Sequence, residues 1–175
     1  MLASQKLIDA FNQQIGNEMG ASMQYIAIAS YFDSETLPQL ARFFYQQSEE
    51  ERVHMLKLIK YINERGGFAI VPQLEQPIVT FQSLRRVFEE FIRHEVGVSE
   101  AINDLVHMAF QEKDYATHNF LQWYVAEQVE EERVARELNE KMELIGEDKS
   151  GLYLFDRDIL NYRNSGAGGR GRKHH

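Results

Sequence analysis

The chain has 175 residues, of which 43% are hydrophobic, and this size suits one domain with a substantial core. Its net charge of -8 opposes general binding to nucleic-acid phosphates and favours cations as partners. It contains no cysteine, which excludes disulfides, thiolate zinc sites and iron-sulfur clusters. Any bound metal must therefore be held by oxygen and imidazole ligands.

The N-terminus lacks a basic segment followed by an apolar run, and no stretch of about 18 apolar residues occurs in the chain. Neither a secretory signal nor a membrane span is expected. The sequence predicts a cytoplasmic protein that binds neither membranes nor nucleic acids.

The first predicted helix covers residues 2–32, where apolar side chains recur at alternating steps of three and four and form one inward face. Glu18 occupies a position on this face where an apolar residue would be expected, and Tyr25 lies on the same face. Residues 33–38 combine capping side chains with a proline and predict a turn into a second helix. Because this connection is short, the two helices should be antiparallel neighbours.

The second predicted helix runs from Pro38 to Arg65 and is stopped by two glycines. Glu51 and His54 are three residues apart on its inward face, so a carboxylate and an imidazole can reach one metal ion together. A single pair of this kind more often belongs to a solvated charged surface. Its meaning depends on whether the other helices repeat the pattern.

Residues 68–80 contain two prolines and show no helical period. A loop of this length is unusual in a compact domain. The second helix is about 40 Å long, and about 13 to 15 extended residues span roughly 40–50 Å. The sequence therefore predicts a crossover that returns along the whole bundle and leaves the second and third helices parallel.

The third and fourth predicted helices also carry acids on their inward faces. The third has Glu95 at the centre of its apolar row, and a tight connection at residues 111–114 leads into the fourth, which Gly146 ends. The inward face of the fourth helix is predicted to consist of Phe120, Tyr124, Glu127, Glu131, Val134, Leu138 and Met142, with Glu130 one step aside.

The end of the chain divides into two parts. Residues 151–162 predict a short fifth helix, and residues 164–175 form a basic, glycine-rich tail that is expected to be flexible. The fold expected for residues 1–163 is all-α: a four-helix bundle with one long crossover plus a short C-terminal fifth helix.

A count along the chain indicates that the inward acids meet at one level. Glu18 and His54 each lie 18 residues from the first turn, taken at residue 36, and Glu95 and Glu131 each lie 18 residues from the second, taken at residue 113. Because the crossover makes the middle helices parallel, both levels lie near the middle of the bundle. The predicted cluster consists of Glu18, Glu51, His54, Glu95, Glu127, Glu130 and Glu131.

Such a cluster requires positive charge or protons to compensate it. Burial of one carboxylate costs several kcal/mol unless the group is paired, and several together also repel one another. No lysine or arginine lies on the four inward faces near this level. Carboxylates with one imidazole suit iron or manganese, and the number of ligands exceeds what one ion needs. The pattern therefore predicts two metal ions.

Five segments carry a resemblance to the non-haem prokaryotic ferritins, and it extends over nearly the whole chain. The longest segment, on the fourth helix, is the most specific, because tryptophan, glutamine and acids follow in one ungapped order. The segments are Asn17-Glu18, Glu50-Glu51-Arg52-Val53-His54-Met55, His94-Glu95, residues 120–132, and Gly151-Leu152-Tyr153.

This resemblance implies a role for each matching residue. Glu18, Glu51 and His54 look like the ligands of a first ferroxidase iron, and Glu51, Glu95 and Glu131 like those of a second. Gln128 would lie near the second iron, and Tyr25 beside the pair. A possible third iron site would be formed by Glu50, Glu127, Glu130 and Glu131. Trp123 lies near enough to Tyr25 in this pattern to join electron donation, and a packing role is at least as strongly indicated.

The resemblance also implies a function: iron storage with ferroxidase activity. Fe(II) would be oxidised to Fe(III) by O2 or H2O2 and deposited as a mineral core inside a homo-oligomeric shell of 24 subunits. An alternative left open is a di-metal carboxylate oxidase or oxygenase that acts on a small organic substrate. A second alternative is a bundle whose acids merely face solvent.

Differences from related families separate this chain from the bacterioferritins, the mini-ferritins and the rubrerythrins. Bacterioferritins carry a haem-binding methionine where this chain has Arg52, and a second Glu-x-x-His where it has Gln128 and Glu131, so no haem is expected. Mini-ferritins lack the fifth helix, and rubrerythrins need cysteines. Structural or surface roles are expected for His94, His107 and His118. Asp114, Thr117 and His118 match positions that line threefold pores in the family.

Overall fold

The structure, a computed structural model, describes residues 2–164, and in this part of the chain it contains helices and connections but no strand. The tail predicted beyond Asn164 lies outside the described residues. None of the described helices combines the length and the apolar character needed to cross a membrane. The helices are α1 (Gln5–Ser34), α2 (Pro38–Glu64), α3 (Leu84–Gln111), α4 (Tyr115–Ile145), α5 (Lys149–Asp158) and the single turn α6 (Asn161–Asn164).

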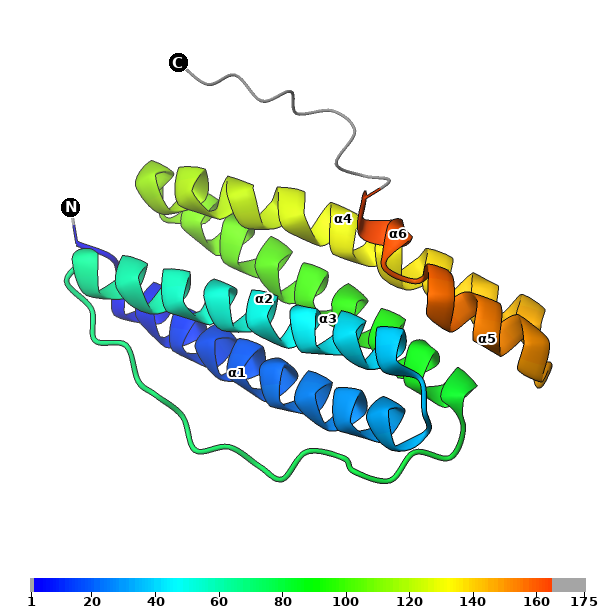
Figure 1. Cartoon of the computed structure of the whole chain (residues 1–175). Helices are drawn as coiled ribbons and strands as arrows, with labels where there is room; N and C mark the ends of the chain where they lie inside the picture. The colour runs from blue at the N-terminus through cyan, green and yellow to red at the C-terminus, as the bar shows by residue number, and fades with distance from the viewer. Residues whose placement is uncertain (1, 165–175) are drawn as a thin grey trace, which may run out of the picture.

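Helices α1 to α4 form the predicted bundle of two antiparallel hairpins (Figure 1). Each hairpin closes with one residue in the left-handed region, Thr36 with φ of 62° and Lys113 with φ of 56°. The long segment between α2 and α3 runs along the outside of the bundle from one end to the other, so α2 and α3 are parallel (Figure 1). The all-α fold and its single crossover are therefore confirmed.

Two side-chain amides of α1 hold the crossover against the bundle. Asn12 donates to the carbonyl of Phe68 at 3.1 Å and accepts from the backbone N–H of Ile70 at 2.8 Å. Gln24 makes the same pair of hydrogen bonds with both backbone groups of Ile78, at 3.0 and 2.9 Å. These bonds satisfy backbone groups of an extended segment that has no neighbouring strand.

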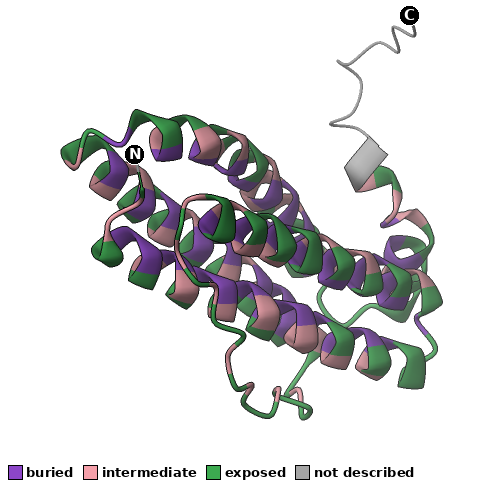
Figure 2. Cartoon of the chain, turned by 90° about the vertical axis from the view of Figure 1, so that its left-hand side faces the viewer, coloured by how far each residue is buried: buried purple, intermediate pink, exposed green. Residues whose placement is uncertain are grey.

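Buried residues lie on the inward faces of the bundle helices (Figure 2). They form two apolar clusters, one toward each end of the bundle. The first includes Phe32, Phe44, Phe88, Phe91 and Leu138, and the second includes Phe11, Leu58, Ile62, Ile102 and Leu121. On every bundle helix the buried residues that lie between these clusters in sequence are polar, and they form a layer at mid-height.

Helix α5 lies toward the bundle end that holds the α1–α2 turn, and α6 follows beside α4 (Figure 1). Phe155 of α5 enters the core, with its ring centroid 5.4 Å from that of Phe88. The helix begins two residues before the predicted segment, and α6 follows it. Asp156 is 8% exposed, and its Oδ1 accepts hydrogen bonds from the backbone N–H groups of Gln39 and Leu40, at 3.0 and 2.9 Å.

Asp156 therefore caps α2 from a distant part of the chain. The residue in the N-cap position of α2, Leu37, offers no side-chain hydrogen bond, so the first turn of this helix would otherwise leave buried donors unpaired. A carboxylate at the N-terminus of a helix also interacts favourably with the helix dipole. One side chain thus joins the fifth helix to the bundle.

We expect Asp156→Ala to lower the free energy of unfolding by about 2 kcal/mol, since it removes a cap and leaves two N–H groups without their acceptor. Urea unfolding followed by circular dichroism measures the change. Asp158→Ala is the matched control, because this carboxylate pairs with Arg157 and its side chain is 47% exposed. Equal midpoints for the two variants would contradict the capping role.

Candidate metal centre

The polar layer at mid-height contains four buried carboxylates, one from each bundle helix. Glu18, Glu51, Glu95 and Glu131 are at most 8% exposed. This burial contradicts the alternative in which the acids merely face solvent. Carboxylates removed from water in this way require protons, donors or metal ions close by.

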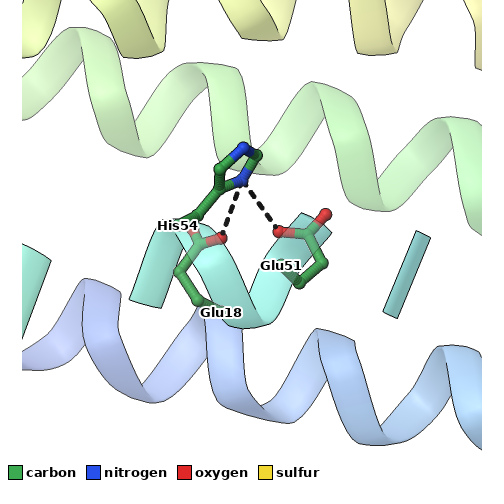
Figure 3. A group of neighbouring side chains, drawn as sticks. All are labelled: Glu18, Glu51 and His54. Atoms are coloured by element: carbon green, nitrogen blue, oxygen red, sulfur yellow. Dashed lines mark hydrogen bonds and ion pairs between the residues drawn. The ribbon is translucent and has the colours of Figure 1, made fainter. Parts of the chain in front are cut away.

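The first candidate ligand group joins α1 and α2. Nδ1 of His54 lies 3.6 Å from Oε2 of Glu18 and 3.3 Å from Oε2 of Glu51. One ring nitrogen thus faces two carboxylates that come from different helices (Figure 3). The three candidate ligand atoms all lie within 4.8 Å of one another, so a single ion can contact all of them.

The second candidate group shares Glu51 with the first. Glu51, His94 and Glu95 offer ligand atoms that also lie within 4.8 Å of one another. Two neighbouring metal positions with a common carboxylate are therefore possible. Of the residues predicted for these positions, Glu18, Glu51, His54 and Glu95 are brought together, whereas His94 was expected to have a structural or surface role.

Glu131 and Gln128 of α4 complete the wall of the layer. Oε2 of Glu131 accepts a hydrogen bond from Nε2 of Gln47 at 3.0 Å. Nε2 of Gln128 lies 3.2 Å from the carbonyl oxygen and 3.3 Å from Oε2 of Glu95. Among the residues that the structure describes, Glu131 belongs to neither ligand group. Gln128 is placed to orient Glu95.

Three further hydrogen-bond donors fix Glu18 and Glu95. Gln14 and Tyr124 both donate to Oε1 of Glu18, and the hydroxyl of Tyr25 donates to Oε1 of Glu95 at 2.5 Å. Tyr25 was predicted from the resemblance, whereas Gln14 and Tyr124 were not. Gln14 lies four residues before Glu18, a spacing that places two side chains on one helix face and was available in the sequence.

One oxygen of this centre lacks a donor. Oε2 of Glu18 is buried and has no hydrogen-bond partner among the described residues. Among the described residues, His54 is the ion-pair partner of both Glu18 and Glu51, and neither carboxylate forms an ion pair with a lysine or arginine. A divalent cation satisfies such an oxygen and balances the carboxylate charge, so the donor set fits a metal ion.

Glu18 and Glu51 have opposite pKa shifts. Burial acts to raise the pKa of Glu18, but the neighbouring side chains of His54, Glu51 and Tyr124 lower it below its usual value. Burial raises the pKa of Glu51 well above its usual value, and the charges of Glu18 and Glu95 act in the same direction. Of the two carboxyl groups, Glu51 therefore binds a proton more tightly, and a cation at this position competes with that proton.

The second position shows the same balance. Burial raises the pKa of Glu95, and the neighbouring His94, Tyr25 and Gln128 partly offset this rise. Burial and the charge of Glu95 raise the pKa of Tyr25 well above its usual value. Tyr25 therefore stays a neutral hydrogen-bond donor across the physiological range.

The predicted third cluster lies toward the surface. Glu50 is half-buried, Glu127 is exposed, and Glu130 pairs with Arg133 at 2.6 Å. The inward face of α4 passes through Gln128 instead of Glu127, because the buried positions Leu121, Tyr124, Gln128 and Glu131 follow steps of three, four and three. The predicted inward position of Glu127 is corrected accordingly, and a third iron site stays a prediction.

Trp123 lies beside the first ligand group. Its ring stacks on Tyr124, with centroids 4.7 Å apart and planes inclined by 6°, and its centroid lies 5.5 Å from that of His54. Nζ of Lys57 lies over the Trp123 ring, 3.8 Å from its centroid. These contacts establish a packing role and place the indole next to the centre.

The residues matched to threefold pores form a hydrogen-bonded group at the α3–α4 turn. Asp114 is paired with Arg65 at 2.7 Å and accepts from the backbone and hydroxyl groups of Thr117. Burial opposes the low pKa of Asp114, while the contacts with Thr117 and Arg65 produce it. His107 is exposed and His118 is half-buried.

The fold and the site together define a class: four-helix bundles with buried carboxylate and histidine side chains that can hold metal ions at mid-height. Comparison with known proteins specifies the family. The model of the ferritin-like domain matches residues 8–145. The chain belongs to the ferritin family.

Its relatives include bacterial non-heme ferritins. It is 39% identical to the one from Campylobacter jejuni over 160 residues, which cover 91% of this chain and 96% of the relative. It is 37% identical to a probable bacterial non-heme ferritin-like protein of Haemophilus influenzae, over 91% of this chain and 97% of that protein. The open pore ferritin of Archaeoglobus fulgidus superimposes with a TM-score of 0.87 at 44% identity, over 89% of this chain and 96% of that one.

Proposed function

We propose that this protein oxidises Fe(II) to Fe(III) at the mid-bundle centre and stores the product as a mineral. The observation that carries the proposal is the pair of buried ligand groups that share Glu51. Two Fe(II) ions held side by side can give one electron each to the same oxidant. O2 takes up two electrons and two protons to become H2O2, and H2O2 takes up the same number to become water.

Each side chain has a distinct task in this proposal. Glu18 and His54 hold the first iron, Glu95 and Glu131 hold the second, and Glu51 bridges the two. Tyr25 and Gln128 orient Glu95 through the hydrogen bonds described above. Anionic oxygen ligands stabilise Fe(III) relative to Fe(II), which favours the oxidation. New Fe(II) can bind only after the Fe(III) product has left the site.

Storage requires a container, and we propose a shell of 24 subunits. The relatives are ferritins by name, and the outer face of this chain carries apolar residues suited to subunit contacts. The crossover exposes a row of large apolar side chains, namely Phe68, Ile70, Val71, Ile78 and Val79. Exposed apolar side chains concentrated on one segment are consistent with a surface that contacts another subunit.

Anaerobic titration with Fe(II), followed by addition of O2 or H2O2, tests the function. We expect two Fe(II) ions to bind per subunit and to be oxidised rapidly when the oxidant is added, with a slower phase when more iron is supplied. Protein saturated with Zn(II) is the control and should lose the fast phase. Light scattering after size-exclusion chromatography measures the assembly. Absence of saturable Fe(II) binding would contradict the ferroxidase, and a stable monomer would contradict the shell.

An oxidase or oxygenase for an organic substrate would need an apolar cavity at the metals. A cavity of about 380 Å³ lies beneath the crossover, and its wall includes Tyr25, Phe91 and His94. None of the four buried carboxylates belongs to its lining. The polar surroundings of these carboxylates favour passing ions over a bound organic molecule.

A further inference from the structure

A hollow beneath the crossover reaches the wall of the metal centre. It consists of two adjoining cavities of about 380 and about 880 Å³, whose walls come from α1, α3 and the crossover. Cavities of this size lie within the range that proteins use to admit small molecules. We call the two together the crossover hollow. The wall residues that both cavities share are Ala21, Gln24, Ile78, Glu90 and His94.

His94 connects the crossover hollow with the metal centre. Its half-buried ring lines both cavities, and it offers a nitrogen within 4.8 Å of ligand oxygens of Glu51 and Glu95. Its Nε2 has no hydrogen-bond partner among the described residues, so it can bond to a small polar molecule that passes. Tyr25, which donates to Glu95, lines the smaller cavity. One layer of side chains therefore separates the hollow from carboxylates that are themselves at most 3% exposed.

The carboxylate and guanidinium charges on the walls of the hollow balance. Glu75 and Glu90 are matched in number by Arg86 and Arg93. Nη1 of Arg93 also lies 2.8 Å from Oε1 of Glu90, so these two charges compensate each other directly. A passage for Fe(II) would be expected to carry an excess of acids, because such an excess concentrates cations. Balanced walls suit an uncharged molecule better.

Two glycines widen the larger cavity. Gly20 of α1 and Gly97 of α3 both line it. Inside a helix, glycine is less favourable than alanine, because it loses more conformational freedom on folding. A Cβ at either position would meet no side chain within 4 Å, other than those of adjacent residues, in the part of the chain that the structure describes. Packing therefore does not require these glycines, and their effect is to keep the cavity open.

We propose that the crossover hollow is the path by which the oxidant reaches the second metal position, passing His94 last. O2 and H2O2 are both uncharged and small, as the walls of the hollow require. The inference rests on the proposed oxidation of iron and gives the oxidant an approach from the crossover side of the bundle. The width of the hollow then limits how fast the oxidant arrives, whereas the affinity for metal does not depend on it.

Substitutions at the two glycines test this path. Gly97 lies three residues after His94 on the same face of α3, and Gly20 lines the same cavity from α1. Leucine at either position narrows the cavity, and the free space around each Cβ lets the side chain fit without displacing the helices. Gly97→Leu and Gly20→Leu should therefore fold and assemble as the parent does, which light scattering checks.

Ser99→Leu is the matched control on α3. Ser99 lines a separate cavity of about 360 Å³ between α3 and α4, whose wall also includes Gln128. Its hydroxyl has no hydrogen-bond partner among the described residues, so leucine removes none. Because the side chain of Gln128 contacts that of Glu95, this second cavity is also the rival route to the metal position.

The measurement is stopped-flow oxidation of the anaerobically Fe(II)-loaded, assembled protein at several concentrations of O2 and of H2O2. Both glycine variants should lower the second-order rate constant by about 10-fold, which corresponds to about 1.4 kcal/mol on the barrier. Ser99→Leu should leave this constant unchanged, and calorimetry should show the parent affinity for Zn(II) in all three variants.

Three outcomes would overturn the path and spare the proposed function. They are parent rate constants in both glycine variants, a loss of rate in Ser99→Leu alone, and a loss of rate in the glycine variants that is matched by weaker Zn(II) binding. The last of these would show that leucine disturbs the metal positions themselves. A parent that shows no rapid oxidation of Fe(II) would overturn the path and the proposed function together.

Discussion

Glu51→Ala should slow the rapid oxidation of Fe(II) by at least about 100-fold. Loss of a residue that merely orients a ligand costs about 10- to 100-fold, so loss of a ligand common to both positions should cost more. Substitution of Glu18 or Glu95 would remove a ligand from one metal position only, whereas Glu51 belongs to both ligand groups. Stopped-flow absorbance of Fe(III) after mixing with O2 measures the rate.

The control for this variant is Glu49→Ala. Glu49 lies on the same helix but faces solvent, and its contact with Arg52 is 3.9 Å long between exposed side chains. Both variants should assemble as the parent does, since neither substitution removes apolar packing. If Glu51→Ala oxidises Fe(II) as fast as Glu49→Ala, the assignment of the centre is wrong.

Divalent metal should raise the melting temperature by about 5–10 °C. Binding only to the folded state stabilises by about 2.7 kcal/mol at a free concentration 100-fold above Kd. For a chain of this size, each kcal/mol shifts the melting temperature by about 2–4 °C. Anaerobic melting with and without Zn(II) or Fe(II), followed by circular dichroism, measures the shift.

The pH dependence of this shift follows from the raised pKa of Glu51. In the metal-free protein, this carboxyl binds a proton more tightly when folded than when unfolded. Its contribution to stability is therefore complete below the unfolded value, about 4.3, and is lost as the pH rises through the higher folded value. Protons compete with the metal in the same range, so the shift should be larger at pH 7 than at pH 5.

Glu51→Gln separates the effect of charge from that of shape. The amide has nearly the same size, needs no proton to be neutral, and cannot bridge two cations. The metal-free variant should melt at a higher temperature than the parent at pH 7, and added metal should shift it much less. A parent whose melting is insensitive to Zn(II) would show that these acids do not hold metal.

The fold was predictable because its main features depend on periodicity and length. Apolar steps of three and four define the four helices, and residues 68–80 are long enough to span the whole bundle as a crossover. The structure adds what holds that crossover, namely the amides of Asn12 and Gln24. Their partners are backbone groups, which leave no trace in the pattern of side chains.

The sequence predicted those site residues that place a charged side chain on an otherwise apolar helix face. An acid such as Glu18 or Glu95 on an apolar face is conspicuous, whereas an aromatic residue such as Tyr124 on the same face reads as packing. His94 was missed because adjacent residues on a helix point about 100° apart, so spacing along α3 does not place it with Glu95. Its proximity to Glu51, on another helix, is a product of tertiary packing.

The cap that Asp156 provides also sets an order of events during synthesis. The α1–α2 hairpin is complete when the ribosome has made residue 64, but the acceptor for the N–H of Leu40 is 116 residues further along the chain. At about 5–20 residues per second, the 92 residues that separate residue 64 from Asp156 take between roughly 5 and 18 s to translate. The nascent hairpin therefore waits with a frayed first turn on α2, and the bundle locks at that end only when the chain is nearly finished.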